Sequence, residues 1–242
     1  MIAATSSTFH VEPWQWLAFL ALVTTLLLVD LVVVHRNPHV ISIKEAAIES
    51  AIWISIGVAF TGVVYLWQGS QPAQEYITGF LLEKSLSIDN VFVWAVIFGY
   101  FAVPAMYQFR VLFWGIFGAL VLRAMFIFAG VAVIERFEFA LVVFGLILLY
   151  SAWKIAFHDD QEVHPENNPV LRLVRRLVPS TNEYDGQKLF TTENAKRVAT
   201  PLFAVLIIME TTDLVFAVDS VPAVLAVSHE QFIVFSSNAF AI

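Results

Sequence analysis

Residues 199–221 read ATPLFAVLIIMETTDLVFAVDSV, a stretch that is apolar over the length of a membrane span and yet contains three acidic residues. A helix needs roughly 20 mainly apolar residues to cross a bilayer, so this stretch predicts a transmembrane helix. A charged side chain near the centre of such a helix costs on the order of 3 kcal/mol. The stretch therefore predicts a membrane protein whose spans carry a polar site.

The composition of the whole chain agrees with a membrane protein. The 242 residues are 59% hydrophobic and 14% charged, whereas soluble domains carry about 25% charged residues. The chain has no cysteine, which excludes disulfides, thiolate metal ligands, Fe–S clusters and thiol catalysis. A net charge of −7 argues against a nucleic-acid partner. Neither a phosphate-binding loop nor a Gly-x-Ser-x-Gly elbow occurs, so we do not expect an enzyme.

Apolar windows of span length recur along the chain and predict an all-α polytopic membrane protein. We expect six full spans and a truncated seventh, which begins near Gln231 and has about 11 residues where roughly 20 are needed. The first span is not read as a signal peptide, because no Lys or Arg precedes it and no small-residue cleavage site follows. The expected spans are residues 14–34, 46–67, 76–103, 109–134, 137–157, 199–221 and 232–242.

The basic residues outside the spans predict the orientation. Cytoplasmic loops hold an excess of Lys and Arg, and ten of these residues fall in alternate loops or at the span ends beside them, whereas the opposite set has only Arg136. We therefore expect the N-terminus outside and the polar segment 158–198 in the cytoplasm. The ten residues are Arg36, Lys44, Arg110, Lys154, Arg172, Arg175, Arg176, Lys188, Lys196 and Arg197.

Residues 170–178 within this polar segment read VLRLVRRLV and have two helical faces. The pattern is typical of a short helix on an anionic membrane surface, and a gating helix is the alternative. A second alternative in this segment is metal sensing by four residues near its start, although such residues in a loop are more often only solvated. The apolar face holds Val170, Leu173, Val174 and Leu177, and the basic face holds Arg172, Arg175 and Arg176. The four residues considered for metal sensing are His158, Asp159, Asp160 and His164.

Charged residues inside the spans carry the functional argument. If Lys84 and Arg123 each neutralise one carboxylate, four of the six acids lack a protein partner, and protons or cations must supply the missing charge. Asp30 and Asp219 lie near span ends, where water is an alternative partner, whereas Asp89 and Asp213 lie near the middle. The eight residues are Asp30, Glu83, Lys84, Asp89, Arg123, Glu210, Asp213 and Asp219.

Two related motifs predict the arrangement of these acids. Residues 87–92 read SIDNVF and residues 211–216 read TTDLVF, on the third span, which runs inward, and the sixth span, which runs outward. Antiparallel copies of this kind are typical of an inverted repeat, which places a substrate site near the bilayer midplane between the two halves. We therefore expect an inverted 3+3 repeat followed by part of a seventh helix.

Oxygen atoms are the ligands that the spans offer. Glu210 and Asp213 share a helix face, and Pro222 predicts a kinked or unwound segment that leaves a backbone oxygen free. Asn90 and Asn238 add amide oxygens, with hydrogen bonding between helices as the alternative for Asn90. Hard oxygen ligands suit Mg²⁺, Ca²⁺ or Mn²⁺. The thioether of Met209 would favour Mn²⁺, but methionine in a membrane helix is usually filler.

At these residues the sequence resembles the TerC family of membrane proteins, within the LysE-type transporter superfamily. The match extends over nearly the whole chain, and the resembling stretches are residues 30–39, 44–46, 80–90, 123–130, 199–203, 210–223 and 237–241. The resemblance implies a bacterial inner-membrane protein linked to manganese efflux, to metal supply for exported proteins and to tellurium resistance. The family normally continues beyond the last of these motifs.

The leading hypothesis is that the protein exports a divalent cation, which we expect to be Mn²⁺ rather than Ca²⁺ or Mg²⁺. In this hypothesis Asp89 and Asp213 are the central ligands, and proton exchange on a neighbouring carboxylate is the driving force. The alternatives are an accessory membrane protein that binds metal structurally, and a tellurium-resistance component, although an acidic cavity repels an oxyanion. The expected ligands are Asp89, Asp213, Glu210, Glu83, Asp219, Asp30, Asn90 and Asn238, with Arg123 and Lys84 as counter-charges. The resemblance implies that these ligands and Arg123 match motifs of the family.

Overall fold

The computed structural model describes residues 11–34, 39–137, 139–157, 169–193 and 195–242, apart from the side chains at 33, 89, 154–156 and 175. Arg36 and the four residues considered for metal sensing, His158, Asp159, Asp160 and His164, lie outside the described residues. The helices are α1 (Pro13–Val29), the π-helical turn η1 (Asp30–Val34), α2 (Ile43–Gln68), α3 (Ser70–Tyr100), α4 (Ala105–Arg136), α5 (Ala140–Phe157), α6 (Pro169–Leu177), α7 (Pro201–Leu225) and α8 (Gln231–Ala241).

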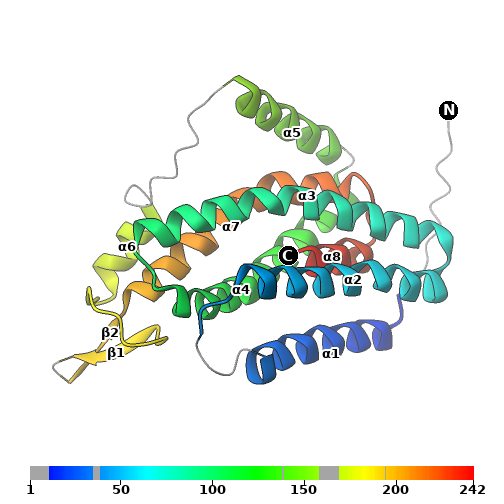
Figure 1. Cartoon of the computed structure of the whole chain (residues 1–242). Helices are drawn as coiled ribbons and strands as arrows, with labels where there is room; N and C mark the ends of the chain where they lie inside the picture. The colour runs from blue at the N-terminus through cyan, green and yellow to red at the C-terminus, as the bar shows by residue number, and fades with distance from the viewer. Residues whose placement is uncertain (1–10, 35–38, 138, 158–168, 194) are drawn as a thin grey trace.

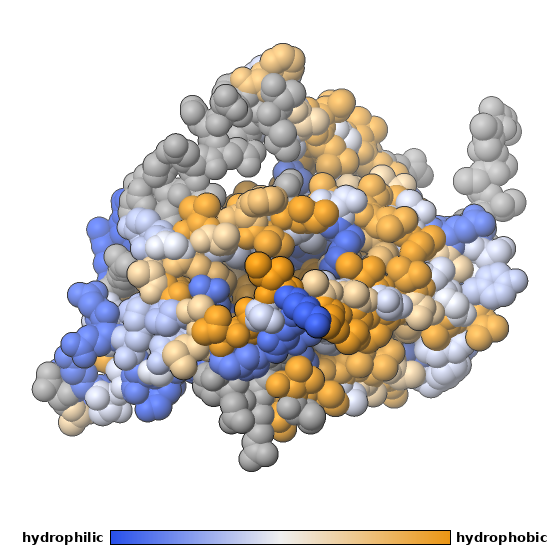
Figure 2. Space-filling view, viewed as in Figure 1, coloured by the Kyte–Doolittle hydropathy of each residue, from blue (hydrophilic) through white to orange (hydrophobic). Residues whose placement is uncertain are grey.

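Helix length and composition confirm an all-α membrane protein. Within the described residues, four helices are long and apolar enough to cross a membrane, namely Pro13–Val32, α2, α4 and α7. Helix α3 is longer than α2 but carries Glu83, Lys84 and Asp89, and α5 is apolar over the shorter range Ala140–Trp153. Large apolar side chains such as Leu66 and Phe92 are exposed on the helices, and Figure 2 shows hydrophilic residues gathered at the end that carries the β-hairpin.

Helix α8, the expected start of a seventh span, lies in the middle of the bundle. It packs against α2, α3 and α4 (Figure 1), and nine of its 11 residues are buried. Its aromatic residues join a cluster with α1 and α2, in which the ring of Phe232 lies 5.6 Å from Phe19 and the ring of Phe240 lies 4.9 Å from Phe60. This short helix therefore holds several longer helices together.

The two motif-bearing helices, α3 and α7, run antiparallel. The hydroxyl of Ser228, just after α7, donates to Glu75 in the first turns of α3 at 2.6 Å. At the other end, residues at the start of α7 line a pocket with Tyr100 and Phe101 from the end of α3. Antiparallel helices are what an inverted repeat requires, but the 3+3 repeat itself stays a prediction.

Helix α7 continues through Pro222 to Leu225. The expectation that the chain unwinds after Asp219 is therefore wrong. Proline has no N–H group, so the carbonyl of Val218 still lacks the usual donor four residues on. Pro222 lies close to the C-terminal end of the helix, where losing one hydrogen bond need not interrupt the helix.

The polar segment between α5 and α7 contains α6 and a hairpin that the sequence did not predict. Strands β1 (Phe190–Glu193) and β2 (Lys196–Ala199) pair antiparallel, with Phe190 opposite Ala199. The Arg197 guanidinium lies 4.5 Å from the centre of the Phe190 ring. Helix α6 buries Leu171, while Leu173 and Leu177, on the face expected to be apolar, are exposed.

Candidate functional site

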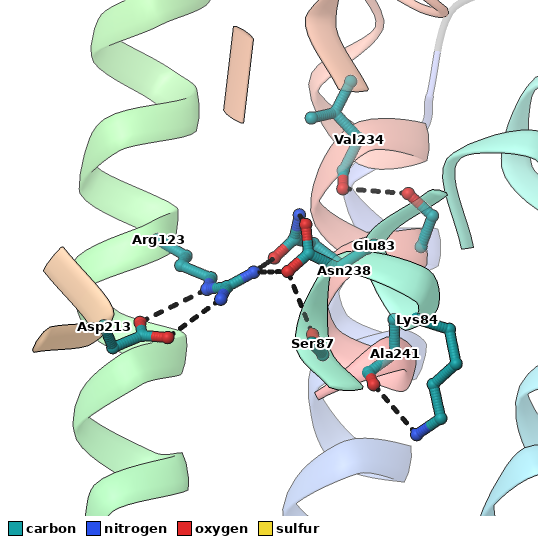
Figure 3. A network of polar contacts seen from close by, with 9 residues as sticks. Glu83, Lys84, Ser87, Arg123, Asp213, Val234, Asn238 and Ala241 are labelled. Atoms are coloured by element: carbon teal, nitrogen blue, oxygen red, sulfur yellow. Dashed lines mark hydrogen bonds and ion pairs between the residues drawn. The ribbon is translucent and has the colours of Figure 1, made fainter. Parts of the chain in front are cut away.

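A buried ion-pair network occupies the centre of the helix bundle, around Arg123 of α4. Its guanidinium holds both carboxylate oxygens of Asp213 from α7, with Nη2 at 2.8 Å from Oδ1 and Nε at 3.3 Å from Oδ2. Arg123 is 1% exposed and Asp213 is 4% exposed. Figure 3 shows this paired contact on one side of the guanidinium. The geometry matches the planar fork that arginine offers to a carboxylate.

Glu83 of α3 and Asn238 of α8 lie on the other side of the guanidinium (Figure 3). Arg123 Nη1 donates to Glu83 Oε1 and also to Asn238 Oδ1, the latter at 2.8 Å. The Asn238 amide donates to Glu83 Oε2 at 3.1 Å, and the Ser87 hydroxyl donates to Oε1 at 3.2 Å. Glu83 is completely buried. Four helices therefore meet in one connected set of polar contacts.

The network keeps one net negative charge, because two carboxylates face one guanidinium. An arginine remains protonated in proteins, so Arg123 always contributes its positive charge. The surroundings are apolar helices, where an uncompensated charge is expensive. The remaining negative charge therefore has to be offset, for example by a proton on one of the carboxylates.

The structure assigns the counter-charges differently from the expectation that Lys84 and Arg123 each neutralise one carboxylate. Arg123 contacts two carboxylates, whereas the Lys84 ammonium donates to the Ala241 carbonyl at 3.0 Å. The physical reason is that the five N–H groups of arginine can bridge partners on two helices. Lys84 instead contacts a backbone oxygen of α8.

Glu210 lies on α7, one turn before Asp213, with its carboxylate against Gly118 of α4. A methyl group at position 118 would collide with that carboxylate, so only glycine leaves room for it. Its Oε2 atom is buried and has no hydrogen-bond donor among the described residues. Burial of an ionised carboxylate without a partner is strongly unfavourable, so this atom needs a proton, a water molecule or a cation as its partner.

In the described part of the chain, the other predicted ligands are not among the hydrogen-bond partners of Arg123. Asp219 accepts a hydrogen bond from the Ser151 hydroxyl of α5 at 2.6 Å, and Asp30 begins η1 at the end of the first helix. Asn90 is buried in α3. Asp89 belongs to α3 as well, but its side chain lies outside the described residues.

The structure thus brings together Glu83, Asp213 and Asn238 around Arg123. In the described part of the chain, which leaves out the Asp89 side chain, no group of three or more acidic or histidine residues is arranged to hold a metal ion. Sequence reasoning missed Gly118 and Ser151 as contributors to the polar sites. A small residue inside a span is a common packing feature, and no sequence signal marks the one that faces a carboxylate.

The profile of the integral membrane protein TerC family matches residues 68–242. The chain belongs to the TerC family. The matched range contains all four network residues, Glu83, Arg123, Asp213 and Asn238, while Asp30 lies before it. The network is therefore located in the part of the chain that the family shares.

Relatives of this TerC-family chain match it over almost its whole length. It is 47% identical over 231 residues to "Uncharacterized membrane protein STKORF319" of Myxococcus xanthus, covering 96% of this chain and 72% of that protein. It is 40% identical over 239 residues to "Putative membrane-bound redox modulator Alx" of Escherichia coli O6:H1, and the match covers 95% of this chain and 74% of that protein. An "Uncharacterized membrane protein" of Rickettsia bellii is 37% identical over 228 residues, and the match covers 94% of this chain and 76% of that protein. No solved structure matches the chain.

Proposed function

We propose that this TerC-family protein exports a divalent metal cation across the bacterial inner membrane and that the cation binds at the carboxylates around Arg123. The observation that carries the proposal is the buried network itself, in which Glu83 and Asp213 outnumber their single guanidinium partner inside apolar helices. Ionisable residues buried in a membrane domain commonly line ion pathways.

The donor atoms support a hard cation. Glu83 and Asp213 offer carboxylates, and Asn238 offers an amide oxygen. The chain has no cysteine, so thiolate ligands that would favour soft metals are absent. We propose Mn²⁺ as the substrate, before Ca²⁺ or Mg²⁺, and Asp89 as a further ligand from α3. Proton exchange on a neighbouring carboxylate is the proposed driving force, and Glu210, Asp219, Asp30 and Asn90 are the remaining candidate ligands.

The proposed orientation places the N-terminus outside and residues 158–198 in the cytoplasm. Arg172 and Arg176 of α6 are exposed, as is Lys188 in the loop before β1. Excess basic residues on one side support the cytoplasmic placement of that side. The exposed apolar residues Leu173 and Leu177 support contact of α6 with the inner membrane surface.

The proposal predicts that Asp213→Asn abolishes export. The amide keeps the size of the side chain but removes the charge that a cation needs, so a manganese-sensitive strain expressing the variant should accumulate Mn²⁺ as the empty-vector strain does. Growth and cellular Mn²⁺ content measure the effect. Asp185→Asn is the matched control, because Asp185 lies in the loop before β1 and bonds only locally, to Lys188 and Thr191. Wild-type export by both Asp213→Asn and Asp89→Asn would contradict the proposal.

Gly118→Ala should lower export with little loss of stability. The new methyl group displaces the Glu210 carboxylate, which is the end of a flexible side chain and can move away. Displacing a positioned group by about 1 Å can lower the rate of an enzyme reaction roughly 100-fold. We expect a fall of about 10- to 100-fold in the export rate. Gly62→Ala on α2 is the control, because nothing lies within 4 Å of its added methyl group. Equal rates in the two variants, at equal melting temperatures, would remove Glu210 from the mechanism.

A second candidate function is an accessory membrane protein that binds metal without moving it. A relative, "Putative membrane-bound redox modulator Alx", is named for a redox role and not for transport, and this favours a function other than export. A redox role in this chain could not use its own thiols, since its 242 residues contain no cysteine. The accessory function predicts a bound, immobile ion and no flux. Direct handling of tellurite conflicts with the negative charge of the network, which repels an oxyanion.

A further inference from the structure

Arg123 links Glu83 of α3 to Asp213 of α7, the two carboxylates to which the proposed divalent cation would bind. Its guanidinium joins Glu83 to Asp213, and it accounts for the hydrogen bonds of three of the four carboxylate oxygens, with Asn238 on the fourth. A divalent ion bound to the same two carboxylates would make the same link. The two cations therefore compete for one position.

Charge decides whether they can be present together. The network with Arg123 has one net negative charge, so a divalent ion added to it would create one net positive charge in an apolar interior. The ion alone on Glu83 and Asp213 gives a neutral group. Two positive centres within a few ångströms also repel each other strongly at low dielectric. Because arginine does not lose its proton in proteins, Arg123 can leave only by moving.

The structure offers an acceptor for the displaced guanidinium. Glu210 Oε2 is buried without a donor among the described residues, and its carboxylate touches α4 at Gly118. Gly118 lies five residues before Arg123 on the same helix, about 7.5 Å along the axis. Glu210 is also one turn before Asp213, the residue that Arg123 would leave. The two acids therefore lie on successive turns of α7, a helix that packs against α4.

We propose that Arg123 is a tethered counter-cation, which holds Glu83 and Asp213 when the site is empty and swings to Glu210 when a divalent ion displaces it. This inference rests on the proposed function and assigns a role to a residue that binds no metal. In the empty state Arg123 donates hydrogen bonds to both carboxylates and neutralises one of their two charges. In the loaded state the metal has Glu83 and Asp213, and Arg123 has Glu210. Each cation then faces carboxylates of its own.

The test measures the Kd of Mn²⁺ by calorimetric titration of the purified full chain in detergent. Arg123→Gln removes the competing charge, so we expect the Kd to fall by about tenfold or more, because an internal occupant lowers the apparent affinity in proportion to its occupancy. Arg123→Lys should give an intermediate Kd, since a single ammonium bridges two carboxylates less well than a guanidinium. If Arg123→Gln does not fold, the Kd of Arg123→Lys alone tests the proposal. Arg110→Gln, which removes the same charge elsewhere on α4, should leave the Kd unchanged.

Glu210→Gln tests the second position of the guanidinium through a double-mutant cycle. We expect Glu210→Gln to raise the Kd of the wild-type chain by more than it raises the Kd of Arg123→Gln, because the second background has no guanidinium to receive. Equal changes in both backgrounds would overturn Glu210 as the acceptor. An unchanged or higher Kd in both Arg123 variants would overturn the counter-cation while leaving the proposed function in place. Failure of the wild-type chain to bind Mn²⁺ would overturn both.

Discussion

Glu83→Ala should lower the free energy of unfolding by about 3–5 kcal/mol, the range measured when one partner of a buried ion pair is removed. Glu83 is completely buried and accepts hydrogen bonds from Arg123, Asn238 and Ser87. Its loss leaves Arg123 with Asp213 as its one carboxylate partner and leaves the Asn238 amide without its acceptor. Because these residues come from α3, α4, α7 and α8, the loss loosens four helices at once. Denaturation in mixed micelles, followed by circular dichroism, measures the effect.

Glu75→Ala is the matched control for this prediction. Glu75 lies on the same helix and accepts hydrogen bonds from Ser228 and Gln71, but at the outer end of the bundle. We expect a cost below about 1 kcal/mol for this partly solvated carboxylate, as for exposed charged pairs. Equal stability losses in the two variants would mean that the network around Arg123 does not stabilise the fold.

Phe232→Ala should be the next most damaging substitution, because it empties the aromatic cluster at the start of α8. The Phe232 ring is 1% exposed and lies 5.1 Å from Trp16 and 5.6 Å from Phe19. Truncation of a buried phenylalanine costs about 3–5 kcal/mol in soluble proteins. In lipid the solvent contribution is smaller and the lost packing remains, so we expect the lower end, about 3 kcal/mol. The same micelle denaturation measures it.

Phe92→Ala provides the comparison, since Phe92 is 69% exposed on α3. Truncating an exposed side chain leaves no cavity, and we expect the unfolding midpoint to stay close to that of the wild type. A larger loss for Phe92→Ala than for Phe232→Ala would show that α8 does not organise the bundle as its burial indicates.

The sequence predicted what depends on length and composition. Apolar windows locate the helices because a bilayer sets their length, and buried acids stand out because each one is costly in lipid. The approximate bounds of α2, α4 and α7 follow from this alone. The cost of acids in lipid also selects Glu83 and Asp213 as site residues, and Asn238 was selected for its amide oxygen. The role of all three as metal ligands stays a prediction.

The partners of these residues could not be predicted from the sequence. Whether Arg123 faces one acid or two depends on the rotation of four helices about their axes, and the apolar pattern of a span that is hydrophobic all round does not fix that rotation. The position of α8 among α2, α3 and α4 was hidden for the same reason. The β1–β2 hairpin was missed because its strands have four residues each, too few for a clear alternating pattern.

The most direct test of the central claim is Mn²⁺ flux into proteoliposomes that contain only this chain. We expect time-dependent Mn²⁺ uptake that exceeds the uptake of Ca²⁺ and Mg²⁺, responds to an imposed pH gradient and disappears in Asp213→Asn. A wild-type protein that binds Mn²⁺ at equilibrium but gives the same flux as empty liposomes would contradict the account and favour the accessory function.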